Sequence, residues 1–125
     1  MIRIVDCRPR DAFRAGHVPG AVNLDPEDDL TGPVGDASRG RHPLPPADEL
    51  AAAFGRAGIG DETFVLACDE GTGWAARCWW LLRHLGHDAA GTIDLRGYAG
   101  PRERGQGPPV PPASFSARPR ERDTV

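Results

Sequence analysis

The chain has 125 residues, with 15 arginines, no lysine and 18 acidic side chains, so its formal net charge is −3. This length predicts one domain, and an acidic body with scattered arginines argues against nucleic acid as a partner, because phosphate binding uses a clustered basic face. No apolar run approaches the roughly 18–20 residues that span a bilayer, the first residues lack a signal-peptide pattern, and three cysteines do not make a disulfide framework. Composition therefore predicts a cytoplasmic protein without a membrane partner.

Short elements alternate along the first half of the chain. Residues 2–7 (IRIVDC) are typical of a buried parallel strand, and residues 10–15 predict one or two helical turns closed by Gly16. Residues 21–24 predict a short second strand. The stretch 25–45 is polar and rich in Gly and Pro, which predicts a long loop.

The alternation continues after this loop. Residues 46–57 predict a helix that opens with a proline and two acids, and residues 63–68 (TFVLAC) are the strongest strand candidate. A loop over 69–73 leads into a helix from about 74 to 85, and residues 91–95 predict a last strand. This order indicates an α/β domain with a parallel sheet, whose ligand site lies at the carboxyl ends of the strands.

The end of the chain has a different composition. Residues 100–125 are rich in Pro, Gly and Arg, whereas residues 1–99 carry 10 arginines against 15 acids. We therefore expect a domain over 1–99 followed by a C-terminal linker or tail over 100–125.

Several segments in order resemble the rhodanese, or thiosulfate sulfurtransferase, family. Residues 6–8 (DCR) and 13–21 (FRAGHVPGA) resemble its "DxR…F…GHIPGA" signature, and residues 39–45 (RGRHPLP) resemble the "GRHPLP" segment of tandem-domain members. Residues 75–87 resemble the helix after the active-site loop, and residues 115–118 (FSAR) are similar to the link between two rhodanese domains. The resemblance implies a three-layer α/β domain with a central parallel sheet, equivalent to the N-terminal half of a tandem sulfurtransferase.

Two features depart from the family pattern. The family has a strand and a helix ahead of the strand that ends at Asp6, whereas in this sequence Met1 lies only five residues ahead of Asp6. Residues 94–97 (DLRG) stand where the family has "LDGG" followed by a Trp. The resemblance therefore implies a domain that lacks the family's first strand and helix.

The resemblance also implies a reaction, in which a Cys takes a sulfane sulfur from a donor such as thiosulfate, as a persulfide, and passes it to an acceptor such as cyanide. No cofactor or metal is implied. The nucleophile must be a thiolate, stabilised by cationic groups or by backbone N–H groups of a loop entering a helix. Two ways of counting along the motifs place this position on Asp69, with an active-site loop of Asp69, Glu70, Gly71, Thr72, Gly73 and Trp74. A third count places it on Cys68.

The two registers predict different functions. An Asp at the nucleophile position is typical of the non-catalytic half of tandem sulfurtransferases, because a carboxylate cannot carry a sulfane sulfur. Cys68 is the only candidate nucleophile, and the adjacent acids Asp69 and Glu70 would raise its pKa and repel thiosulfate. We therefore favour a non-catalytic domain, with a second rhodanese domain C-terminal to it as the expected partner. The alternative is an active sulfurtransferase that forms a persulfide on Cys68 and binds a small sulfur-containing anion.

Other residues have simpler interpretations. Arg8 and Arg77 could contact an anion, although such an arginine more often pairs with a local acid such as Asp6. We expect a structural hydrogen bond for His17 and core packing for Trp79, Trp80 and Cys78. The acidic run over 25–29 is interpreted as a solvated loop. Zinc spacing and the Cys-x5-Arg loop of phosphatases are both absent from the sequence.

Overall fold

A computed structural model describes residues 1–32 and 43–120 of the chain. Its elements are β1 (Ile2–Asp6), α1 (Arg10–Ala15), β2 (Val22–Asn23), α2 (Ala47–Arg56), β3 (Phe64–Asp69), α3 (Trp74–His84) and β4 (Ala90–Asp94). Each predicted element is present, with bounds that differ by at most one residue. Part of the segment 39–45 and the last five residues lie outside the described part. None of the described helices is long and apolar enough to cross a membrane.

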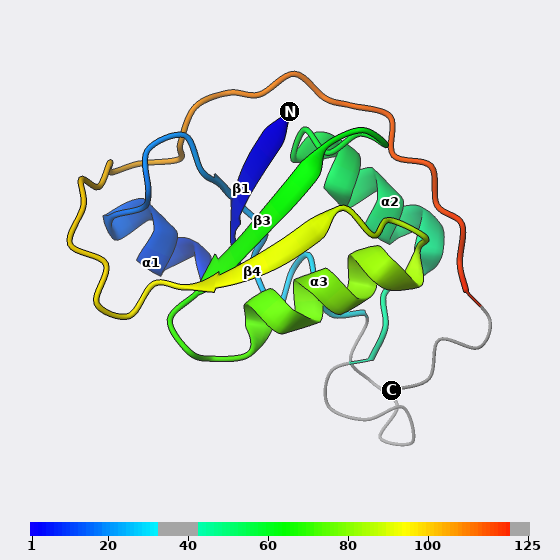
Figure 1. Ribbon diagram of the computed structural model, residues 1–125, viewed down its shortest axis with the longest axis horizontal. Coiled ribbons are helices and arrows are strands. Elements are labelled where there is room, and N and C mark those ends of the chain that lie inside the picture. The colour runs from blue at the N-terminus through cyan, green and yellow to red at the C-terminus, as the bar shows by residue number, and fades with distance from the viewer. Residues whose placement is uncertain (33–42, 121–125) are drawn as a thin grey trace.

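The four strands form one parallel sheet in the order β2-β1-β3-β4. Because β2 and β3 lie on opposite sides of β1, right-handed crossovers place α1 on one face and α2 and α3 on the other (Figure 1). The predicted three-layer α/β architecture is therefore confirmed.

The core lies between the sheet and the α2–α3 face. Strand residues such as Val5 and Val65 point toward this face and pack against Phe54 of α2 and Leu81 of α3. Apolar residues recur on both helices at helical spacing, so each helix buries one stripe. The expected core packing of the tryptophans is wrong for Trp79, whose side chain is 37% exposed.

The tail folds back over the domain rather than leaving it. Residues 103–120 run from α1 along the molecule to the far end of α3, as the orange and red path in Figure 1 shows. Glu103 exchanges two backbone hydrogen bonds with His17, at 2.9 and 2.8 Å. The ring of Phe115 packs 5.1 Å from the ring of Phe54 and 5.4 Å from that of His87.

The tail also satisfies the ends of two helices. The N–H of Ala113 donates to the carbonyl of Gly55 in the last turn of α2 (2.9 Å), and the N–H of Arg120 donates to the carbonyl of His84 in the last turn of α3 (2.8 Å). Carbonyls at a helix C-terminus have no partner inside the helix. The tail thus supplies the donor to His84, whereas Gly55 also accepts the N–H of Gly58 at 3.0 Å.

Candidate functional site

The candidate site lies where β3 passes into α3, at the carboxyl ends of the strands. Residues 70–73 form the connection, and Gly71 and Gly73 have φ values of +79° and +92°. These left-handed conformations suit glycine, because other residues adopt them at a steric cost. They turn successive backbone N–H groups toward the inside of the loop, an arrangement that binds anions.

The side chain of Asp69 occupies the inside of this loop. Its Oδ1 accepts the N–H of Gly71 at 3.0 Å, and its Oδ2 accepts the N–H groups of Gly73 at 3.0 Å and Ala75 at 2.9 Å. The hydroxyl of Thr72 donates to Oδ2 at 3.3 Å. Asp69 is only 6% exposed, so the negative charge that this loop stabilises is its own carboxylate.

Cys68 points away from the loop. Successive side chains of a strand face opposite sides of the sheet, and the Cys68 thiol donates to the carbonyl of Val5 at 3.5 Å. Burial, with a smaller effect of the charges of Asp6 and Asp69 and against an opposing effect of Arg8, raises its pKa to about 12. The thiol therefore stays protonated at neutral pH.

The guanidinium of Arg8 binds other groups of the protein. Its Nε and Nη2 bind the carboxylate of Asp6 at 2.8–3.1 Å, Nη2 donates to the carbonyl of Gly16, and Nη1 binds Glu70 at 2.9 Å. The hydrogen bond to Asp6 is the largest cause that raises the pKa of Arg8. Arg8 thus joins the end of β1 to the loop after β3, and its polar atoms face protein groups.

Arg77 has a similar structural use. From α3 it donates to the carbonyls of Leu30 at 3.2 Å and Pro43 at 3.0 Å. Burial lowers its pKa, although the guanidinium remains charged. Both carbonyls belong to the stretch 25–45, so Arg77 connects residue 30 with residue 43.

The acidic run and His17 are also structural. The carboxylate of Asp25 accepts the backbone N–H groups of Arg10, Glu27 and Asp28 at 2.9–3.0 Å, so the interpretation of this run as a solvated loop is wrong for Asp25. The ring Nδ1 of His17 lies 2.9 Å from the carbonyl of Phe13, in the kind of hydrogen bond that we expected. In residues 1–32 and 43–120, no group of three His, Cys, Asp or Glu side chains is placed to hold a metal ion.

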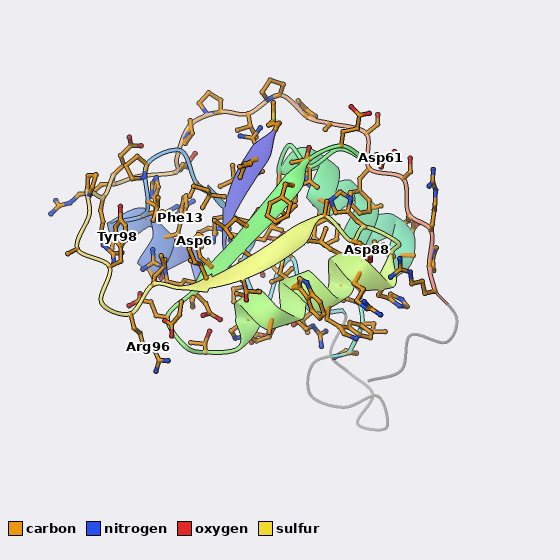
Figure 2. The ribbon with its side chains drawn as sticks, viewed as in Figure 1. Asp6, Phe13, Asp61, Asp88, Arg96 and Tyr98 are labelled. Atoms are coloured by element: carbon orange, nitrogen blue, oxygen red, sulfur yellow. The ribbon has the colours of Figure 1, made fainter. Side chains whose placement is uncertain are left out.

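The sequence did not predict that Arg96 lies beside the loop. Arg96, after β4, binds Asp94 through Nε at 2.9 Å and lies against Gly71, where a Cβ would come 2.6 Å from the guanidinium carbon. Figure 2 shows Arg96 and Asp6 at this edge of the sheet. A repeated Asp-x-Arg pattern at 6–8 and 94–96 could have indicated this contact. In both copies the arginine donates to the aspartate two residues before it.

Comparison with known proteins decides the family. The model of the Rhodanese-like domain family matches residues 1–97. The chain belongs to this family. This rhodanese-like domain is 44% identical over 75 residues to a probable 3-mercaptopyruvate sulfurtransferase of Pseudomonas aeruginosa, covering 59% of this chain and 26% of that protein. It is 37% identical over 90 residues to the human 3-mercaptopyruvate sulfurtransferase, covering 68% and 28%.

Solved structures agree with the sequence comparison. A 3-mercaptopyruvate sulfurtransferase from Leishmania major aligns with a TM-score of 0.79 at 27% identity, over 95% of this chain and 37% of that one. An Escherichia coli 3-mercaptopyruvate sulfotransferase aligns at 0.78 and 28% identity, over 96% and 50%. The domain thus belongs among the rhodanese-like sulfurtransferases, and it spans about a quarter of the two curated relatives' lengths.

Proposed function

We propose that this rhodanese-like domain is the non-catalytic half of a tandem sulfurtransferase and forms no persulfide by itself. The observation that carries the proposal is the carboxylate of Asp69 inside the loop between β3 and α3. Sulfur transfer needs a thiolate among such N–H groups. A carboxylate at this position cannot carry a sulfane sulfur as a persulfide, and its negative charge repels an incoming anion such as thiosulfate.

The competing possibility is a sulfurtransferase that uses Cys68. Its thiol is 1% exposed and points to the carbonyl of Val5, on the other side of the strand from Asp69. A pKa of about 12 leaves a very small thiolate fraction at neutral pH. Burial and charge together therefore oppose attack by Cys68 on a sulfur donor.

We further propose that the domain works beside a catalytic rhodanese domain, which residues 100–125 connect to it. The chain covers only 26–28% of the curated relatives and 37–50% of the aligned structures, which supports a larger functional unit. Its rim of Glu70, Arg8 and Arg96 is held by internal ion pairs. A rim of this kind can shape the edge of a neighbouring pocket without taking part in the chemistry.

Mass spectrometry and a colour assay test the proposal. The protein is incubated with thiosulfate or 3-mercaptopyruvate, its intact mass is measured, and thiocyanate formation is followed after cyanide is added. An active rhodanese serves as positive control. We expect no added sulfur and no thiocyanate above the buffer rate. A sulfur adduct that disappears in Cys68→Ser but persists in Cys78→Ser would overturn the proposal.

A further inference from the structure

A cavity lies at the edge of the sheet, beside β2. It has a volume of about 430 Å³ and is enclosed by α1, β2, α2 and residues 106–110 of the tail. Phe13, Val22 and Leu24 are buried and form its apolar floor. A volume of this size is within the range of small-molecule sites. The described residues that line it exclude the loop between β3 and α3, so this cavity is separate from the candidate functional site.

Three arginines form the charged walls of this cavity. Arg10 and Arg14 stand four residues apart on α1, so their side chains share one face of that helix. Arg56 comes from the last turn of α2, on the opposite face of the sheet. Like charges four residues apart on a helix repel each other and destabilise it. The cluster is therefore unfavourable unless negative charge balances it.

Nearby acids do not balance all three arginines. Arg10 pairs with Asp28 at 2.9 Å. Asp29, the one acid among the described lining residues, accepts a backbone N–H at 2.7 Å through its Oδ2. Within the described part of the chain, no ion pair or hydrogen bond holds the guanidinium of Arg14 or Arg56, and both side chains are exposed. Two positive groups at the cavity are thus open to a dissolved ligand.

We propose that this cavity binds a small organic dianion, a dicarboxylate whose two acidic groups bind Arg14 and Arg56. A guanidinium binds a carboxylate through two parallel N–H donors, so each arginine matches one carboxylate. Because the two arginines come from different helices, two separated carboxylates fit them better than one sulfate or phosphate. The carbon chain between the carboxylates then lies over the apolar floor. We expect a Kd on the order of 0.1–1 mM, rising with ionic strength because salt screens exposed charges.

A titration followed by two-dimensional amide NMR at constant ionic strength tests the site. Succinate, glutarate and adipate vary the spacing of the two carboxylates, butyrate has a single carboxylate, and glutaramide has none. We expect saturable shifts with at least one dicarboxylate at amides of the cavity, such as those of Phe13, Asn23 and Ala57. Butyrate and glutaramide should bind about tenfold more weakly or not at all.

Three variants of equal charge test the assignment of residues. Arg14→Gln and Arg56→Gln each remove one guanidinium from the cavity, and Arg118→Gln removes an exposed one beyond the end of α3. The first two should weaken binding about tenfold, and Arg118→Gln should bind like the wild type. Amide spectra establish that each variant is folded, and the shifts of the wild type locate the ligand independently of the variants.

The other outcomes contradict the proposal. The absence of saturable shifts with all three dicarboxylates would show that the cavity binds no such ligand. Shifts centred on Gly71 and Gly73 would place the anion at the loop between β3 and α3 instead. Unchanged binding by Arg14→Gln and Arg56→Gln would place the contacts elsewhere. Sulfate binding as tight as that of the best dicarboxylate would indicate a general anion site rather than one for an organic dianion.

Discussion

Replacing Asp69 by alanine should destabilise the domain, because three backbone N–H groups lose their acceptor. Gly71, Gly73 and Ala75 each donate to this carboxylate at 2.9–3.0 Å. A hydrogen bond to a charged group contributes about 1.5–3 kcal/mol, and the contributions of neighbouring bonds are not additive. We expect Asp69→Ala to lower the free energy of unfolding by about 3 kcal/mol, with a fall in Tm of about 10 °C.

Two further variants make the comparison specific. Asp69→Asn keeps a carbonyl oxygen that can replace Oδ2 as acceptor for Gly73 and Ala75, but its amide group faces the N–H of Gly71. Its destabilisation should be about half that of alanine. Asp94→Ala removes an exposed carboxylate at the same edge of the sheet, paired with Arg96, and should leave Tm unchanged within error.

Urea unfolding followed by circular dichroism, together with calorimetry, gives the three values. If Asp69→Ala were as stable as the wild type, the carboxylate would not be the group that organises the loop. If asparagine were as destabilising as alanine, the loss would come from charge rather than from the pattern of acceptors. Either result would refute the hydrogen-bond reasoning and remove the main support for the proposed function.

Four further predictions follow from the same contacts. Cys68, with a pKa of about 12, should resist iodoacetamide at pH 8 in the native state and react fully in urea; native labelling at the unfolded rate would contradict its burial. Asp69→Cys should place a thiol among the loop N–H groups, so its alkylation should be half-maximal below the usual pKa of about 8.5; a midpoint above that value would mean that the loop does not stabilise a thiolate. Burial alone would raise the pKa of Asp25, but hydrogen bonds from Asp28, Arg10 and Glu27 hold it below its usual range. Its stabilisation is therefore present above about pH 4 and lost as pH falls through the lower folded value, and Asp25→Asn should flatten that part of the stability profile; an unchanged profile would assign the acid sensitivity to other carboxyls. Phe115→Ala should cost about 1–2 kcal/mol of stability, whereas the exposed Ser114→Ala should cost little, and equal effects would show that the tail does not pack against the domain.

Most of the fold could be predicted from local pattern. Apolar β-branched runs at 2–7 and 63–68, and helices bounded by prolines and glycines, carry strong signals, so these elements formed close to their expected bounds. The family could be predicted because its motifs occur in the expected order, and the match over residues 1–97 confirms it.

The packing of the tail could not be predicted in the same way. Pro-rich composition indicates an extended chain, but it does not say which surface that chain lies on. Part of its attachment depends on backbone donors, such as the N–H of Ala113. Every residue except proline has such a donor, so the sequence does not show which of them bind. Phe115 was a usable signal, since one aromatic residue in a polar tail needs a place to pack.

Adjacent residues at the site were also hard to separate by counting alone. Cys68 and Asp69 differ by one position, and in a strand one position decides which side of the sheet a side chain faces. In the structure, the carboxylate of Asp69 lies inside the loop, and the thiol of Cys68 points toward the carbonyl of Val5. Which side chain occupies the loop follows from geometry that composition does not contain.

The capping of α2 and α3 by the tail has a consequence for synthesis on the ribosome. Chains emerge from the N-terminus at about 5–20 residues per second, and the carbonyl of His84 in α3 finds its partner only when Arg120 has emerged. Helix α3 can form earlier, but the carbonyl of His84 remains solvated until residue 120 follows. Folding of this domain is therefore completed late, by the same stretch of chain that would lead into any domain translated after it.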